Sequence, residues 1–215
     1  MLFSTYFRAL SAGKKTAFVA VLAALSVVVN CFSIDIGASN KIAFTYTVCF
    51  FAGYLLGGVP AFFVALFGDV IGYLVNPVGV YWLYGVTLGL YAFLMGVVMN
   101  VPLGKGHRAA PYIKAAAALL LGYVIVTVFL NSLINYSYLM VFVWNGAPTK
   151  TFLVYLGGRL AFQTIVYAVN FAICVVLLPV LVHIGRTGSK NRKTPPAEGE
   201  GERVRPGVHD RPDNP

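Results

Sequence analysis

The sequence predicts an all-α membrane protein built from six transmembrane helices, with both termini in the cytoplasm. Of its 215 residues, 59% are apolar and 11% are charged, whereas a soluble domain carries about 25% charged residues. Charged side chains are costly in hydrocarbon, so long uncharged stretches mark candidate spans. The net charge of +9 does not indicate nucleic-acid binding, because the basic residues border apolar stretches instead of alternating with aromatic ones.

Uncharged stretches divide the chain into six candidate spans. The block between Lys41 and Lys105 contains a single charge, and its Gly/Pro turn signals at 57–60 and 76–79 separate three spans within it. The second span of the chain is short, at about 16 residues or ~24 Å. Short segments broken by Gly and Pro often line a cavity in membrane proteins. The predicted spans are 14–33, 42–57, 60–76, 81–100, 113–138 and 150–184.

The distribution of lysine and arginine gives the orientation in the membrane. With the N-terminus in the cytoplasm, 13 of the 16 basic residues lie inside, only Lys41 and Lys150 lie outside, and Arg159 lies within a span. An odd number of spans would remove this asymmetry. The last 30 residues contain five Pro and four Gly and cannot build a core. The chain therefore divides into an interfacial segment on the inner membrane surface, 1–13, a membrane domain, 14–185, and a disordered cytoplasmic tail, 186–215.

Sequence patterns typical of catalysis and metal binding are missing from the chain. The three cysteines are odd in number and have no C-x-x-C spacing, so neither a disulfide framework nor a metal site follows from them. The stretch Gly13-Lys14-Lys15-Thr16 lacks the first glycine of a phosphate-binding loop, because Arg8 occupies that position. No histidine stands in a catalytic pattern. The sequence thus predicts a protein that is not an enzyme and has no ATPase site, metal or cofactor of its own.

Two charged residues, Asp69 and Arg159, fall inside predicted spans, where each alone costs about 2.5–3.5 kcal/mol on insertion scales. In one interpretation they pair with each other and stabilise the bundle. In the other, one or both face a polar cavity open to the outside, since Arg159 lies about 13 Å below the outer end of its helix. Further polar residues group in the outer halves of neighbouring spans, each with a helix–helix hydrogen bond as its alternative role: Asn76, Tyr84, Thr87, Asn131 and Asn135.

Ala20 and Ala24 form a pattern of small residues one turn apart on the first span. Such a pattern allows two helices to approach closely. The close neighbour is either another helix of the same bundle or a helix of a partner protein. The spacing alone does not decide between the two, because the same pattern recurs on two other spans.

A series of loose motifs follows the predicted helices in a fixed order. The motifs are Ile42-Ala43-Phe44, Ala52-Gly53 to Gly57, Gly68-Asp69 to Gly72, Pro77-Val78-Gly79, Asn131-x-Leu133 and Arg159-Leu160. Their order and spacing over residues 14–182 resemble those of the substrate-binding S components of energy-coupling-factor (ECF) vitamin transporters, in particular the folate-type family. The aromatic-Pro-Gly-Phe-Thr start of that family's fourth helix reads Trp82-Leu83-Tyr84-Gly85-Val86-Thr87 here.

The resemblance implies a subunit of an ABC importer in the bacterial cell membrane. S components capture a vitamin outside, here folate or a related compound, and dock on a membrane T component that carries two cytoplasmic ATPases. The alternative functions are a self-sufficient small secondary transporter or channel and, less well supported by the motifs, a small membrane enzyme. The resemblance also implies that Ala20 and Ala24 form the docking surface. The expected substrate-binding residues are Arg159, Asn131, Asp69, Tyr84, Thr87 and Trp82.

Overall fold

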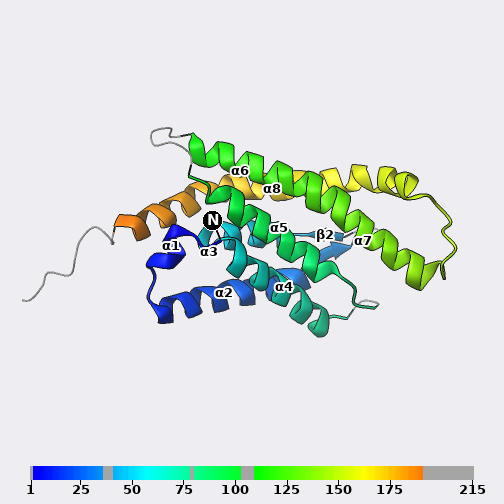
Figure 1. The fold of residues 1–215 in the computed structure, drawn as a ribbon, viewed down its shortest axis with the longest axis horizontal. Coiled ribbons are helices and arrows are strands. Elements are labelled where there is room, and N and C mark those ends of the chain that lie inside the picture. Colours follow the sequence, from blue (N-terminus) through cyan, green and yellow to red (C-terminus); the bar gives the residue numbers. More distant parts are fainter. Residues whose placement is uncertain (1, 36–40, 78–79, 103–108, 191–215) are drawn as a thin grey trace, which may run out of the picture.

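The computed structural model describes residues 2–35, 41–77, 80–102 and 109–190, whose helices run side by side in an elongated bundle (Figure 1). The segments η1 and η2 are π-helical, and α6 to η2 form one uninterrupted helical run. In chain order the elements are α1 (Thr5–Ala9), α2 (Ala12–Cys31), β1 (Ser33–Asp35), β2 (Lys41–Ala43), α3 (Thr45–Leu56), α4 (Gly58–Val75), α5 (Tyr84–Met99), α6 (Ala110–Leu121), η1 (Gly122–Leu130), α7 (Asn131–Tyr138), η2 (Leu139–Val143) and α8 (Phe152–Lys190).

Each predicted span coincides with a helix or a helical run. Four of them are long and apolar enough to cross a membrane by length and composition: α2, α4, the run 110–143 and the part of α8 up to residue 184. The other two, α3 and α5, are shorter apolar helices of 12 and 16 residues. The fold is therefore a helical membrane bundle with four candidate spans and two shorter apolar helices.

Helix α3 is enclosed by the bundle, which explains how so short an apolar helix is accommodated. Nine of its twelve residues are buried, and the side chains of Phe50 and Leu56 are fully inaccessible. Glycines bring α3, α4 and α5 together. A Cβ on Gly53 would lie 2.7 Å from the backbone nitrogen of Gly96, and a Cβ on Gly96 would lie 2.4 Å from that of Gly58. Helices pack this closely only where side chains are absent from the contact.

The N-terminal segment is attached to the end of α3. Ser4 caps α1, since its hydroxyl oxygen accepts a hydrogen bond from the N–H of Phe7 at 2.9 Å. The same hydroxyl donates to the carbonyl of Leu55, and the Ser4 N–H donates to the carbonyl of Leu56 at 3.0 Å. The position of segment 1–13 on the membrane surface stays a prediction. At the other end of the chain, α8 continues to residue 190, past the predicted start of the tail, and the rest of the tail lies outside the described residues.

A short antiparallel hairpin departs from the all-α prediction. Strands β1 and β2 pair with Ile34 opposite Ile42, between the end of α2 and the start of α3. Backbone groups in a connection between two membrane helices need partners, and a short ladder supplies them. Asn170 of α8 fixes the end of β2, because its side-chain amide donates to the carbonyl of Ala43 at 3.0 Å. Strand β2 therefore includes residues 42 and 43, which the sequence assigned to the start of the second span.

Candidate functional site

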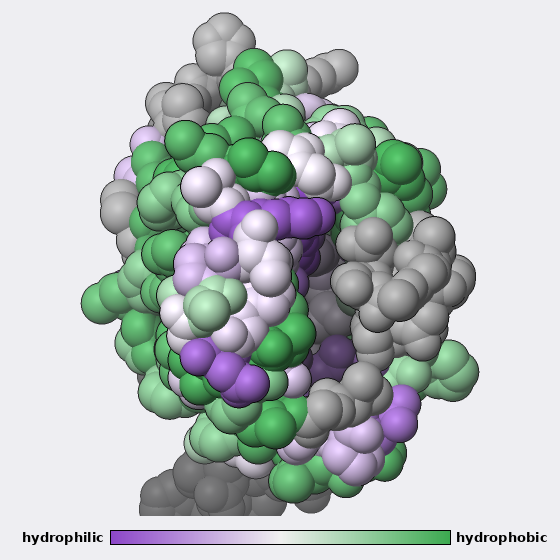
Figure 2. All heavy atoms as spheres, turned by 90° about the vertical axis from the view of Figure 1, so that its right-hand side faces the viewer, coloured by the Kyte–Doolittle hydropathy of each residue, from purple (hydrophilic) through white to green (hydrophobic). Residues whose placement is uncertain are grey.

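A cavity of about 470 Å³ lies at the end of the bundle where the hairpin and the ends of α2 and α4 meet the starts of α3, α5 and α8. Figure 2 looks onto this end of the molecule and shows a hollow bordered by hydrophilic side chains. Volumes of about 300–1,000 Å³ are typical of small-molecule sites. Five tyrosines line the cavity, together with the following polar or charged residues: Asn30, Thr45, Asp69, Asn76, Thr87, Asn131, Asn135, Arg159 and Gln163.

Arg159 lines the cavity from the first turns of α8. Its guanidinium donates to the hydroxyl of Tyr155 at 3.0 Å, and its Cζ atom lies 5.6 Å from the centre of that ring. Within the described ranges no ion pair joins Arg159 to Asp69. The interpretation in which the two intramembrane charges pair with each other is therefore wrong. Each has neutral partners instead, which leaves the guanidinium with donors that no described residue uses.

Asp69 lines the same cavity from α4, and neutral donors from two other segments satisfy its carboxylate. Asn30, near the end of α2, donates to Oδ1 at 3.1 Å, and the hydroxyl of Tyr81 donates to Oδ2 at 2.9 Å. The side chain of Asp69 is 9% exposed. A carboxylate so deeply placed in an apolar bundle requires such partners.

Helices α5 and α7 form a polar wall of the cavity with four of the residues that the sequence grouped together: Tyr84, Thr87, Asn131 and Asn135. The hydroxyl of Tyr84 donates to Oδ1 of Asn135 at 3.0 Å. The amide of Asn131 donates to the hydroxyl of Tyr46 at 3.4 Å, close to the limit for a hydrogen bond. The hydroxyl of Thr87 donates to the carbonyl of Tyr84 within its own helix, at 2.6 Å. Thr87 therefore offers the cavity an acceptor oxygen. The side-chain amide of Asn131 makes only a weak hydrogen bond within the protein.

Trp82 is not among the residues that line this cavity, in contrast to its expected place in the substrate site. Its indole N–H donates to the hydroxyl of Ser137 at 3.1 Å, and its ring packs edge-on against Phe142 at 5.3 Å between ring centres. Trp82 thus joins the start of α5 to the C-terminal part of the 110–143 helical run. It supports the wall of the cavity from outside.

Gln163 is the clearest lining residue that the sequence reading missed. It lies one helical turn after Arg159, is 6% exposed and borders the cavity. No hydrogen bond engages its amide among the described residues, and its amide atoms are not among the fully buried ones without a partner, which suits a ligand contact in the cavity. The spacing of four residues from Arg159 on one helix was a signal that could have found it. Asn30, Tyr46 and Tyr81 also line the cavity and were not predicted.

The predicted docking residues lie on the outer face of α2. Ala20 and Ala24 are exposed, as is Val21 between them at 66%. Leu22 and Ser26 are the buried residues of this helix. The alternative in which the two alanines pack inside the bundle is therefore wrong. The structure leaves their side of α2 available to a partner helix or to lipid.

Comparison with known proteins agrees with this architecture. Residues 11–183 match the family described as the ECF-type riboflavin transporter, S component. A crystal structure of FolT bound with folic acid has the same fold, with a TM-score of 0.58 at 20% sequence identity over 76% of this chain and 92% of that chain. An uncharacterized protein, the MG313 homolog of Mycoplasma pneumoniae, is 32% identical over 82 residues, and this chain spans only 29% of its length.

The resemblance to vitamin-transporter S components that the motifs predicted is thus confirmed, and with it a multi-pass location in a membrane. The family match is named for riboflavin, whereas the solved structure with the shared fold holds folic acid. Both are S components, which bind a small vitamin within the membrane. The chain belongs to the family of S components of ECF-type riboflavin transporters.

Proposed function

We propose that this chain captures a vitamin outside the cell and delivers it through docking on a T component that carries two cytoplasmic ATPases. The vitamin is folate or a related compound with a planar ring. The observation that carries the proposal is the cavity of about 470 Å³, in which an arginine that forms no ion pair with any described residue lies among tyrosines and side-chain amides. A cavity with few polar groups at defined positions is the usual form of a small-molecule site.

Arg159 supports a substrate with an anionic or carbonyl-rich group. A guanidinium presents several donors in a planar fork and binds a carboxylate at two points. Only one described residue, Tyr155, accepts from it, so most donors are left for a ligand. Folate carries carboxylates at one end and a planar pterin ring at the other. Riboflavin, the second candidate, has no carboxylate but presents two ring carbonyls, and the family match favours it.

The neutral residues of the cavity suit the ring of such a vitamin. Asn131 and Gln163 offer amide groups that the described residues engage weakly or not at all, and Thr87 offers an acceptor oxygen. Tyr84 presents an aromatic surface beside them, and stacking on aromatic rings recognises planar heterocycles. We assign these four residues, together with Arg159, to substrate contact. Trp82 does not contact the substrate in this proposal. It supports the wall of the cavity through its hydrogen bond to Ser137.

The best test is the binding of folate and of riboflavin to the purified protein, measured by calorimetry and by native mass spectrometry of the protein as isolated. We expect tight binding of one of the two and a copurified ligand of matching mass. A protein that binds neither, and carries no heterocyclic ligand after purification, would contradict the proposal. The comparison also decides between a carboxylate-bearing and a carboxylate-free vitamin.

The charge distribution supports six crossings with both termini in the cytoplasm. The starts of α2 and α6, which carry Lys14, Lys15 and Lys114, lie at one end of the bundle, whereas the turn before α8, which carries Lys150, lies at the other end, near β2 (Figure 1). The cavity then opens to the outside, as capture requires. In this arrangement α3 and α5 cross the membrane inside the bundle despite their length, the 1–13 segment lies on the inner surface, and the tail after residue 185 is cytoplasmic.

This topology predicts the labelling, in intact cells, of two variants that each carry one added cysteine. The background carries Cys31→Ser, since Cys31 is the one native cysteine that is not buried. Ala147→Cys, exposed in the turn before α8, should react with an impermeant thiol reagent added outside. Ala109→Cys, exposed before α6, should react only after the cells are opened. Labelling of Ala109→Cys in intact cells would contradict the assigned orientation.

A further inference from the structure

We propose that Asp69 is a positioning residue, which holds the ring of Tyr81 and the end of helix α2 in the wall of the cavity and does not itself bind the vitamin. The inference rests on the proposed function, because it assigns a role within the same site. It replaces the expectation from the sequence that Asp69 is a direct substrate contact.

Hydrogen bonds to the protein engage both oxygens of the carboxylate. Oδ1 accepts from Asn30 at 3.1 Å and Oδ2 accepts from Tyr81 at 2.9 Å. Bonds to an ionised acceptor are about twice as strong as those between neutral groups. A vitamin that bound Asp69 directly would have to compete with these donors at a side chain that is 9% exposed. Tyr81 lines the cavity beside Asp69 and is the more exposed of the two.

Two glycines leave room for the two donors. A Cβ on Gly85 would lie 2.4 Å from the Tyr81 hydroxyl and 3.2 Å from Oδ2 of Asp69. A Cβ on Gly72 would lie 2.8 Å from the side-chain nitrogen of Asn30. Contacts below 3.0 Å cannot persist, so a larger residue at either position would displace the donor. The local sequence is thus adapted to both hydrogen bonds, on α4 and on the first turn of α5.

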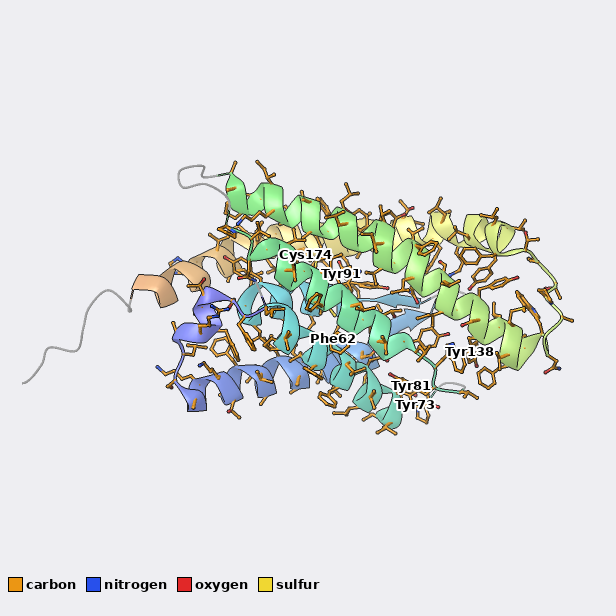
Figure 3. All side chains as sticks on the ribbon, viewed as in Figure 1. Phe62, Tyr73, Tyr81, Tyr91, Tyr138 and Cys174 are labelled. Atoms are coloured by element: carbon orange, nitrogen blue, oxygen red, sulfur yellow. The ribbon has the colours of Figure 1, made fainter. Side chains whose placement is uncertain are left out.

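The bond to Asp69 fixes an aromatic surface. The ring of Tyr81 lies 5.0 Å from that of Tyr73, and both residues line the cavity. Figure 3 shows Tyr73 and Tyr81 together near the end of α4, with Tyr138 nearby on α7. Planar heterocycles stack on such surfaces. A ring anchored through its hydroxyl is already ordered before the vitamin arrives, so binding does not have to immobilise it.

The same carboxylate joins this wall to the helix with the proposed docking face. Asn30 lies on α2, as do Ala20 and Ala24, and it bonds to Asp69 across 39 positions of sequence. Ser26, one turn earlier, is fully buried, and a Cβ on Gly68 would lie 2.1 Å from its hydroxyl oxygen. The end of α2 is therefore held against α4 at two successive turns, next to the cavity.

A double-mutant cycle tests the positioning role, with folate and riboflavin as the probes. Asp69→Asn and Tyr81→Phe should each weaken binding about 3- to 10-fold, the cost of ordering one side chain. The double variant should bind no more weakly than Asp69→Asn alone, because both changes act on the same hydrogen bond between Tyr81 and Asp69. Tyr84→Phe is the matched control. It removes a hydroxyl from the same cavity, but that hydroxyl bonds to Asn135 and not to Asp69, so its effect should multiply with that of Asp69→Asn. A roughly 100-fold loss for Asp69→Asn beside an unchanged Tyr81→Phe would show that Asp69 binds the vitamin.

A measurement without ligand separates this inference from the proposed function. The protein labelled with 3-fluorotyrosine gives one fluorine resonance for residue 81, assigned by its loss in Tyr81→Phe. We expect this resonance to shift or broaden in Asp69→Asn and in Gly85→Ala, while that of the exposed Tyr112 on α6 stays in place. An unchanged resonance in both variants would overturn the positioning role, whether or not either vitamin binds. Wild-type protein that binds neither vitamin would instead contradict the proposed function alone.

Discussion

Lysine in place of Arg159 is expected to weaken vitamin binding by about 100-fold, although the positive charge is retained. The reason is geometric. A guanidinium can donate to both oxygens of a carboxylate or to a ring carbonyl and its neighbour, whereas an ammonium acts as a single point charge. Among the described residues Arg159 has Tyr155 as its one hydrogen-bond partner, and it lies in the cavity wall. Calorimetry with the purified variant measures the loss.

Two further variants decide whether Arg159 acts on the ligand or only on the fold. Tyr155→Phe removes the one described hydrogen-bond partner of the guanidinium and leaves the charge in place. It should change affinity by less than about tenfold, the usual range for one neutral hydrogen bond. Arg159→Gln should melt close to the wild-type temperature and bind poorly. If Arg159→Gln melts normally and binds with wild-type affinity, the assignment of Arg159 as an anchor is wrong.

Leucine in place of Ala24 is expected to abolish most uptake while leaving vitamin affinity unchanged. Ala24 and Ala20 are exposed on α2, so a larger side chain meets no described neighbour within the bundle. At a close helix–helix contact with a T component it would separate the two helices, and overpacking of about 1–3 kcal/mol corresponds to about 5- to 150-fold weaker docking. Uptake assays and copurification with the ATPase subunits report the loss, and calorimetry reports the retained affinity.

Ala168→Leu provides the matched control for the docking surface. Ala168 is also a small, exposed residue on an apolar helix, but it lies on α8. The same added volume there should leave uptake and copurification at wild-type levels. If Ala24→Leu lowered vitamin affinity and spared the assembly, α2 would have a role in the site itself. The docking assignment would then be untenable.

The positions of the helices could be predicted because charge is so strongly excluded from hydrocarbon. Each predicted span corresponds to a helix or a helical run, and the glycine-rich turn at residue 57 falls between α3 and α4. The start of the second span was misplaced, since residues 41–43 pair with 33–35 as a strand and α3 begins only at Thr45. That pairing depends on contacts between chain segments, which local hydrophobicity does not encode.

The site was predictable where a residue type is rare in its surroundings. Arg159 and Asp69 stand out as charges in apolar sequence, and Asn131 as an amide within a span. Tyrosine is common in this chain, with 13 copies, so nothing distinguished Tyr81 as a partner of Asp69. Asn30 lies on a helix whose neighbours become known only from the fold, whereas the four-residue spacing from Arg159 could have identified Gln163. Trp82 was misplaced because its motif gives its position in the chain and not the direction of its ring.

The most direct test of the central claim is vitamin uptake into proteoliposomes, with this chain alone and with a T component and both ATPases. The labelled vitamin is folate or riboflavin, whichever the purified protein binds. The proposed role as a substrate-binding subunit predicts binding but no transport by the chain alone, and ATP-dependent accumulation when the other subunits are present. Accumulation driven by the chain alone, without ATP, would contradict that role and identify a self-sufficient transporter.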